Sequence, residues 1–157
     1  MKRYAVCLLL LATACSSAAK EFAPPGPSPT STLLHSPALI KTAKGSVLFN
    51  VELATTPAQR RHGLMGRSSL GPTDGMAFLF FKPTRAGFWM KNTLIPLTVA
   101  FFDDNGTILK ILNMKPCHAT PCPIYRPGVT YDGALEVNRG ALQKSDVKVG
   151  DVVHLAP

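Results

Sequence analysis

Short apolar runs recur along most of the chain, and prolines, glycines and polar residues separate them. Between Val47 and Leu53 every second residue is apolar, which is the period of a strand with one buried face. Further short runs occur at 38–42, 76–81, 87–90, 97–102, 107–112, 129–137 and 152–155. About eight strands with turn signals between them predict an all-β domain, either a compact sandwich or a partly open barrel.

One or two short helices are expected among these strands. Thr56 followed by Pro57 is typical of a helix N-cap with proline in the first turn, which predicts a short helix over 58–62. A single helical turn is expected over 141–145. Asn105-Gly106 predicts a tight turn between two strands.

The N-terminal 14 residues have the order of a secretory signal peptide. Lys2 and Arg3 precede an apolar stretch over 5–12, and small residues follow it. This stretch is much shorter than the roughly 20 residues that a membrane-spanning helix needs. Cys15 comes next, and the segment resembles a bacterial lipobox, with Ala12 where that motif usually has leucine. We expect lipidation of Cys15 and membrane attachment through it; the alternative is ordinary cleavage to a soluble secreted or periplasmic product.

Residues 15–37 form the expected lipidated N-terminus and tether, because they are rich in proline and serine and lack apolar periodicity. Residues 38–157 remain as a single globular β domain. The chain has 17 Lys and Arg against 9 Asp and Glu, a net charge of +8. For an exported chain without a basic tract or an interleaved aromatic ladder, nucleic acid is not an expected partner. We expect a monomer located in the cell envelope.

Two cysteines, Cys117 and Cys122, remain in the globular part. An even count in an oxidising compartment predicts a disulfide, which would close a small proline-rich loop. A metal site with His118 or Met114 and a redox-active pair are the alternatives.

The first candidate site is the segment from Phe88 to Thr93. If Phe88 points inward in a strand, Trp89 and Lys91 share the opposite face. Together with Asn92 and Thr93 they would provide an apolar wall and a few polar groups, as a small-molecule pocket requires. Alternatively, Trp89 belongs to the core and Asn92-Thr93 form a turn.

A second signal is the excess of cations between residues 60 and 91, where six basic residues face one acid, Asp74: Arg60, Arg61, Arg67, Lys82, Arg85 and Lys91. Converging arginines would bind an anion, because the guanidinium group matches carboxylate and phosphate oxygens. Arg67 and Lys91 are the preferred pair. The alternative is a solvated basic surface.

Three methionines, Met65, Met76 and Met90, suggest another type of site, since thioethers bind copper(I). Methionine is also a common core residue. Glu136 lies in an apolar run, so that a buried ion pair with an arginine is favoured over a role as general base. We find no complete catalytic set. The leading hypothesis is a non-catalytic domain that binds a small anionic or envelope-derived ligand, with copper binding and an unrecognised enzyme as alternatives.

Several motifs occur in an order that resembles the family known as domain of unknown function 192: 63–67, 75–78, 88–93, 94–97, 121–123, 135–137 and 148–151. The resemblance covers about Val47 to Leu155. It implies a compact, sandwich-like β fold with little helix and brings no established substrate or reaction. The family commonly has aspartate where this chain has Thr98, so that a mechanism requiring a carboxylate there is not expected.

Overall fold

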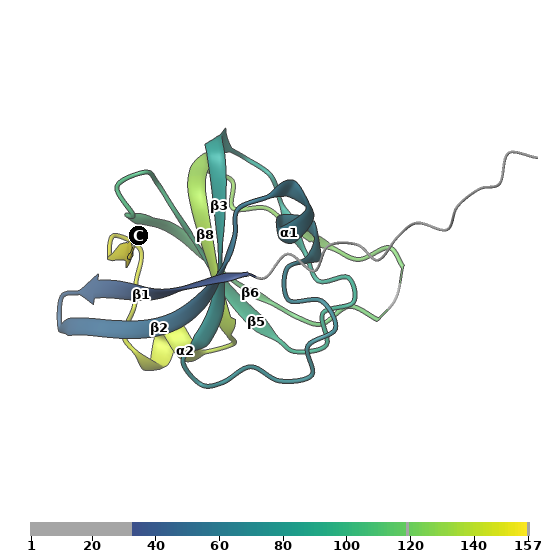
Figure 1. Ribbon diagram of the computed structural model, residues 1–157, viewed down its shortest axis with the longest axis horizontal. Coiled ribbons are helices and arrows are strands. Elements are labelled where there is room, and N and C mark those ends of the chain that lie inside the picture. Colours follow the sequence, from purple (N-terminus) through teal and green to yellow (C-terminus); the bar gives the residue numbers. More distant parts are fainter. Residues whose placement is uncertain (1–32, 119, 157) are drawn as a thin grey trace, which may run out of the picture. The chain divides into compact units, whose positions relative to one another are not determined.

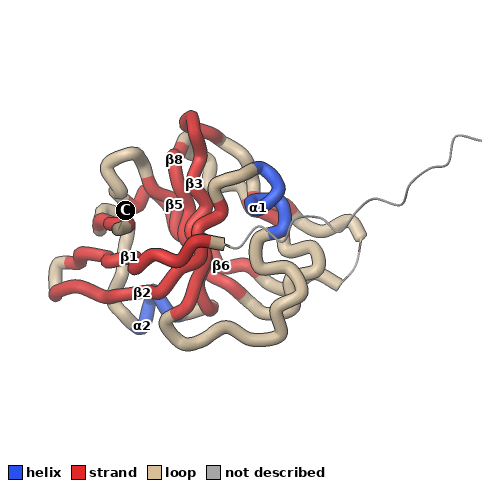
Figure 2. Tube along the Cα trace, in the orientation of Figure 1, coloured by secondary structure: helices blue, strands red, loops and turns tan. Residues whose placement is uncertain are grey.

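The computed structural model describes residues 33–118 and 120–156, so the predicted signal segment, Cys15 and most of the tether lie outside it. Strands dominate this part of the chain and two short helices accompany them, which confirms the predicted β-rich class (Figure 2). The strands are β1 (Leu34–Thr42), β2 (Gly45–Ala54), β3 (Asp74–Thr84), β4 (Phe88–Trp89), β5 (Leu97–Phe102), β6 (Ile108–Met114), β7 (Ile124–Tyr125), β8 (Tyr131–Asn138) and β9 (Val152–Leu155). The helices are α1 (Pro57–His62) and α2 (Ala141–Lys144). No helix of the described residues is long and apolar enough to cross a membrane.

Seven strands form one mixed sheet in the order β6-β5-β8-β3-β2-β1-β9 (Figure 1). β2 and β3 are parallel and α1 lies on the connection between them, whereas the other neighbouring strands are antiparallel. The two outer strands meet at one end, where Thr107 bridges Val152 and the Val153 amide donates to the Gly106 carbonyl at 2.8 Å. The sheet is therefore not a closed barrel, and its ends touch only near this turn.

β1 begins at Leu34, four residues before Ala38, where the sequence pattern placed the start of this strand. It pairs with β2 along its whole length, from Leu34 opposite Leu53 to Thr42 opposite Gly45. Pro37 does not end the strand, because its carbonyl oxygen accepts a hydrogen bond from the Ala156 amide at 3.2 Å. A proline in a strand lacks only the donor, so its carbonyl can still pair.

Two groups of buried side chains form the core, because alternate residues of a strand point to opposite sides of the sheet. One group includes Phe49 and Leu135. The other includes Phe78, Phe101 and Tyr131, whose rings meet their neighbours edge to face at 4.8–5.4 Å. The second group supports the candidate site.

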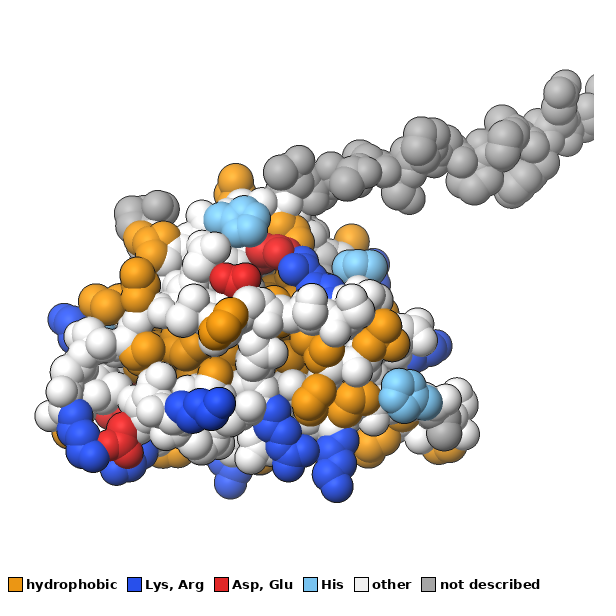
Figure 3. Space-filling model, turned by 90° about the horizontal axis from the view of Figure 1, so that it is seen from below, with side chains coloured by type: hydrophobic (Ala, Val, Ile, Leu, Met, Phe, Trp, Pro, Cys, Tyr) orange, Lys and Arg blue, Asp and Glu red, His pale blue; other side chains and the backbone are white. Residues whose placement is uncertain are grey.

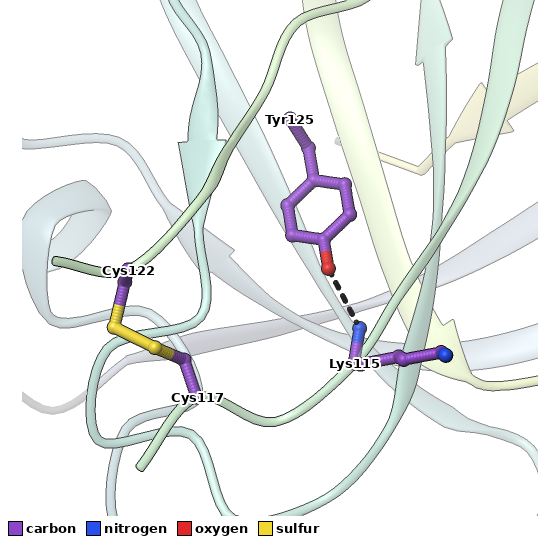
Figure 4. The surroundings of a disulfide bond; sticks show 4 residues. All are labelled: Lys115, Cys117, Cys122 and Tyr125. Carbon is purple, nitrogen blue, oxygen red and sulfur yellow. Dashed lines mark hydrogen bonds between the residues drawn. A yellow bond between two sulfur atoms is a disulfide. The ribbon is translucent and has the colours of Figure 1, made fainter. Parts of the chain in front are cut away.

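A separate two-stranded sheet, β4 with β7, lies against this second group. Phe88 pairs with Tyr125 and Trp89 with Ile124. The predicted disulfide is present: Cys117 and Cys122 are bonded, with a Cα–Cα distance of 5.8 Å, and β7 follows directly (Figure 4). The Tyr125 hydroxyl accepts a hydrogen bond from the Lys115 amide at 3.1 Å. In the chain-entropy description a loop this small adds about 2 kcal/mol to stability, so the bond holds a proline-rich segment that contributes little to the core.

Candidate functional site

The Phe88–Lys91 segment has the expected alternation. Phe88 packs inward, with its ring 5.0 Å from that of Phe78, and Met90 is buried. Trp89 points outward and is 47% exposed, so it is not a core residue. The Lys91 ammonium lies 5.5 Å from the centre of the Trp89 ring, within the range of a cation–π contact. An indole and a cation thus share one exposed face.

A surface hollow of about 360 Å³ opens beside Trp89. Four aromatic side chains, two arginines and three small or cyclic residues line it: Phe78, Phe80, Phe88, Trp89, Arg60, Arg61, Pro57, Ala86 and Gly87. None of these described lining residues is acidic. An apolar wall with a few charged groups at its edge is the usual composition of a ligand site.

The two arginines reach the hollow from the last turn of α1. The helix begins at the predicted N-cap, where the Thr56 hydroxyl accepts from the Gln59 amide at 3.2 Å and Gln59 Oε1 accepts from the Thr56 amide at 2.9 Å. This capping box fixes the start of the helix. Residues 60 and 61 therefore lie at its other end, where Arg60 reaches Leu79 and Phe80 of β3.

Arg60 is held in place on three sides. Its Nη1 donates to the carbonyl oxygens of Thr55 at 2.5 Å and Leu79 at 2.8 Å, and its guanidinium lies 4.9 Å from the centre of the Phe80 ring. Within the described residues, the N–H groups of its Nη2 and Nε remain available to donate hydrogen bonds to a ligand. Within the described part of the chain, the exposed Arg61 side chain has no hydrogen-bond or ion-pair partner. One fixed and one free guanidinium therefore lie beside the same aromatic surface.

Arg67, one of the preferred anion ligands, lies elsewhere. Its Nη2 forms an ion pair with Glu52 Oε2 at 2.5 Å, and it does not line the hollow. Its loop does approach the Trp89 segment, because the Gly66 amide donates to the Asn92 carbonyl at 2.8 Å. The structure thus brings the two motifs together through backbone atoms, while the Arg67 side chain turns toward an acid.

Asn92 and Thr93 form a turn, in which the Thr93 amide donates to the Met90 carbonyl at 3.1 Å. Asn92 has φ of 56°, a left-handed conformation that asparagine tolerates better than most residues. Its side chain is exposed, and Thr93 is only 4% exposed. Neither lines the hollow.

The three methionines differ in their surroundings. Met76 and Met90 are each 1% exposed and belong to the same buried group as Phe78 and Tyr131. Met65 is half-buried in the loop after α1. In the described residues, no group of three or more His, Cys, Asp or Glu side chains is arranged to hold a metal ion.

Glu136 is the unusual ionisable group of the core. It lies on β8 between Met76 of β3 and Val99 of β5 and is only 4% exposed. Within the described residues its carboxyl has no hydrogen bond or ion pair, so the expected buried pair with an arginine is wrong: Arg67 pairs with Glu52. Burial raises the pKa of the Glu136 carboxyl from an ordinary 4.5 to about 8. The carboxyl is therefore largely protonated at neutral pH.

Thr98 occupies the place of the expected family aspartate. It is fully buried, its hydroxyl donates to Asn113 Oδ1 at 2.7 Å, and it accepts from the Gly140 amide at 3.1 Å. Its role in this chain is to join β5, β6 and the turn before α2. Thr98 points to the opposite side of the sheet from Glu136. It pairs with Val137, the residue after Glu136, and successive residues of a strand point to opposite sides.

The sequence predicted that Trp89 and Lys91 share a face, and their side chains do lie together, whereas Arg67, the preferred cation, does not line the hollow. Arg60 and Arg61 were noted as part of the basic segment, and the three phenylalanines of the hollow were assigned to strands. The parallel pairing of β2 with β3 places α1 over Phe78 and Phe80. A short helix between two strands, with basic residues in its last turn, was the available signal.

Fold and site together define a small β-rich domain with an open, basic, aromatic-lined hollow. The chain belongs to the DUF192 family, described as an uncharacterized ACR, whose model matches residues 39–155. No protein of the curated set matches it.

Two solved structures are similar to this chain. One is a candidate transcription regulator from Sinorhizobium meliloti 1021, 34% identical, with a TM-score of 0.73 over 78% of this chain and 95% of that one. The other is a protein of unknown function from Novosphingobium aromaticivorans, also 34% identical, with a TM-score of 0.73 over 85% of this chain and 94% of that one. Each similarity extends over nearly the whole length of the other protein.

Proposed function

We propose that this protein is a non-catalytic binding domain whose hollow beside Trp89 takes a small anionic ligand with an apolar, preferably planar, part. The observation that carries the proposal is the pairing of a fixed Arg60, and an Arg61 that has no partner among residues 33–118 and 120–156, with four aromatic rings. Guanidinium groups bind carboxylate or phosphate oxygens through two parallel hydrogen bonds. The rings offer faces on which a planar group can stack.

Charge around the hollow supports an anion rather than a cation. Its lining has two guanidiniums and no acid in the described residues, and Lys91 lies over the Trp89 ring, 5.5 Å from its centre. The Arg60 guanidinium is positioned before the ligand arrives, because two carbonyl oxygens already hold it. Preorganisation of this kind reduces the entropy cost of binding.

The test uses 2-naphthoate and its neutral counterpart 2-naphthalenemethanol, with the indole N–H resonance of Trp89 as the reporter. The chain has a single tryptophan, so the signal is unambiguous. We expect naphthoate to shift this resonance with an affinity at least tenfold higher than the alcohol, because a hydrogen bond to a charged group contributes about 1.5–3 kcal/mol. Arg61→Ala should weaken naphthoate binding about tenfold.

Arg139→Ala is the matched control, since Arg139 lines a different hollow, beside Val47 and Phe49. It should leave naphthoate binding unchanged. Equal binding of the acid and the alcohol, or the same loss in both arginine variants, would contradict an anion site at Trp89.

We also propose that the protein is exported and attached to a membrane of the cell envelope through a lipid on Cys15. The order of the first 15 residues supports this: two cations, an apolar stretch, small residues and then cysteine. Two or more acyl chains on one residue give a stable anchor, whereas a single chain is only marginal.

Cys15→Ser should move the protein from the membrane fraction to the soluble fraction of cells that express the full chain. Cys117→Ser, which changes a cysteine of the globular part, should leave the distribution unaltered. An unchanged membrane fraction in Cys15→Ser would refute lipid attachment at this residue.

A further inference from the structure

The outward side of the β4–β7 sheet exposes two large apolar side chains next to each other. Trp89 and Ile124 are direct cross-strand partners, and they are 47% and 49% exposed. Their neighbours along the strands, Phe88 and Tyr125, instead pack on the core. Ile124 does not line the hollow, so a small ligand bound there leaves it uncovered.

Cations surround this pair. Lys91 lies over the Trp89 ring, 5.5 Å from its centre. Arg126 lies beside Ile124, because a Cβ atom built on Gly87 would come within 2.4 Å of Ile124 Cγ2 and 3.1 Å of Arg126 Cγ. Both cations are exposed.

Acids are sparse in the part of the chain that contains this sheet. Residues 75–131 include six lysines and arginines and two aspartates, Asp103 and Asp104, which lie in the turn after β5. The sheet is also fixed in place, since the disulfide immediately precedes β7 and Lys91 bridges Cys117. A rigid, positively charged surface with a projecting indole and isoleucine results. The face drawn in Figure 3 likewise shows more basic than acidic side chains, with apolar ones exposed between them.

We propose that this face, defined by Trp89, Ile124, Lys91 and Arg126, docks the folded domain on an anionic lipid surface. Tryptophan is enriched at membrane interfaces, where its ring lies at the level of the headgroups. Lysine and arginine beside it are attracted by anionic lipids. Such docking needs only shallow insertion of a few side chains.

The small size of the apolar pair favours a lipid surface over a protein partner. A stable protein–protein interface covers about 800 Å² on each partner, and two half-exposed side chains offer only a small part of this. Each of the surrounding cations adds electrostatic attraction to a charged bilayer, and this attraction does not require a surface of matching shape. Trp89 belongs to both surfaces, but Ile124, Lys91 and Arg126 do not line the hollow, so the docking does not require the ligand proposed there.

The test measures Trp89 emission of the full chain carrying Cys15→Ser, so that no acyl chain contributes. Vesicles of 30% phosphatidylglycerol in phosphatidylcholine should shift the emission to shorter wavelength, and pure phosphatidylcholine should have at least a tenfold weaker effect. Salt at 0.5 M should remove most of the binding, because it screens the charges.

Added in this background, Ile124→Ser should weaken binding to the anionic vesicles about tenfold, and Arg126→Gln several-fold. Leu48→Ser is the matched control, because Leu48 is 55% exposed on β2 and is not part of the docking face. It should bind like the parent. Equal binding to both kinds of vesicle, or equal weakening by Leu48→Ser and Ile124→Ser, would overturn the proposal. Binding to soluble polyglutamate but not to vesicles would overturn it too, and would indicate an acidic protein partner. Neither Ile124→Ser nor Leu48→Ser should alter naphthoate binding, which separates this result from the test of the hollow.

Discussion

At pH 8 the Glu136→Gln variant is expected to unfold at a higher urea concentration than the parent protein, whereas near pH 4 the two should unfold at nearly the same concentration. The reason is the buried position of Glu136, which lies between Met76 and Val99 with its carboxyl unpaired in the described residues. Burial in apolar surroundings disfavours the charged form of the carboxyl. Glutamine has the same shape and cannot become charged.

The sign of the pH dependence follows from the two pKa values of this group. Burial raises the pKa of Glu136 in the folded protein from 4.5 to about 8, so the folded state keeps the proton where the unfolded chain has released it. Between these pH values the unfolded state binds fewer protons, and the free energy of unfolding therefore decreases as the pH rises. At 1.36 kcal/mol per pH unit, the total loss is at most about 5 kcal/mol. The loss is complete above about pH 8 and absent below 4.5.

Glu52→Gln is the matched control, because it makes the same chemical change on the same sheet face: Glu52 of β2 pairs with Met76 of β3, which in turn pairs with Glu136. Glu52 forms an ion pair with Arg67, whose side chain is 34% exposed. Its loss should destabilise the protein by about 1 kcal/mol, as expected for a partly exposed pair. Urea midpoints measured between pH 4 and pH 9 distinguish the two. If the curves of the parent and Glu136→Gln run parallel over this range, the carboxyl of Glu136 ionises in the folded protein as it does in water.

The strands and turns of this domain were largely predictable from the sequence. Alternation from Val47 to Leu53 corresponds to β2, and Val152–Leu155 is β9 as expected. The N-cap Thr56 and the pair Cys117–Cys122 were also correctly identified. These features depend on neighbours that are close in the sequence, so local patterns carry them.

Strand pairing was not predictable, and it decides which cations lie beside the aromatic hollow. Nothing in the sequence indicates that β2 and β3 are parallel, and this pairing brings Arg60 of α1 to Leu79 and Phe80 of β3. Arg60 and Arg61 therefore reach the aromatic hollow, while Arg67, nearer to the family motifs, finds Glu52. Trp89 and Lys91 were placed correctly relative to each other because only the strand period is needed for that.

Gly106→Ala should destabilise the protein by about 3 kcal/mol or more. Gly106 ends the predicted Asn105-Gly106 turn, but its function in the fold is to join the outer strands: its carbonyl accepts from the Val153 amide at 2.8 Å. A Cβ atom at this position would lie 2.1 Å from the Val153 carbonyl oxygen, which is backbone and cannot rotate away. The residue also has φ of 81°, which costs a side-chain-bearing residue about 1–2 kcal/mol. The clash forces Gly106 and Val153 apart and weakens the junction between the two ends of the sheet, and urea unfolding of the variant measures the loss.

Gly140→Ala separates the clash from the backbone conformation. Gly140 has φ of 84°, nearly that of Gly106, but no atom lies within 4 Å of a Cβ built there. This variant should therefore lose only the conformational cost, about 1–2 kcal/mol. The difference between the two variants reports how much of the stability depends on contact between the ends of the sheet. Equal losses in both would mean that β9 can move away from the turn freely, and that the sheet does not need this junction.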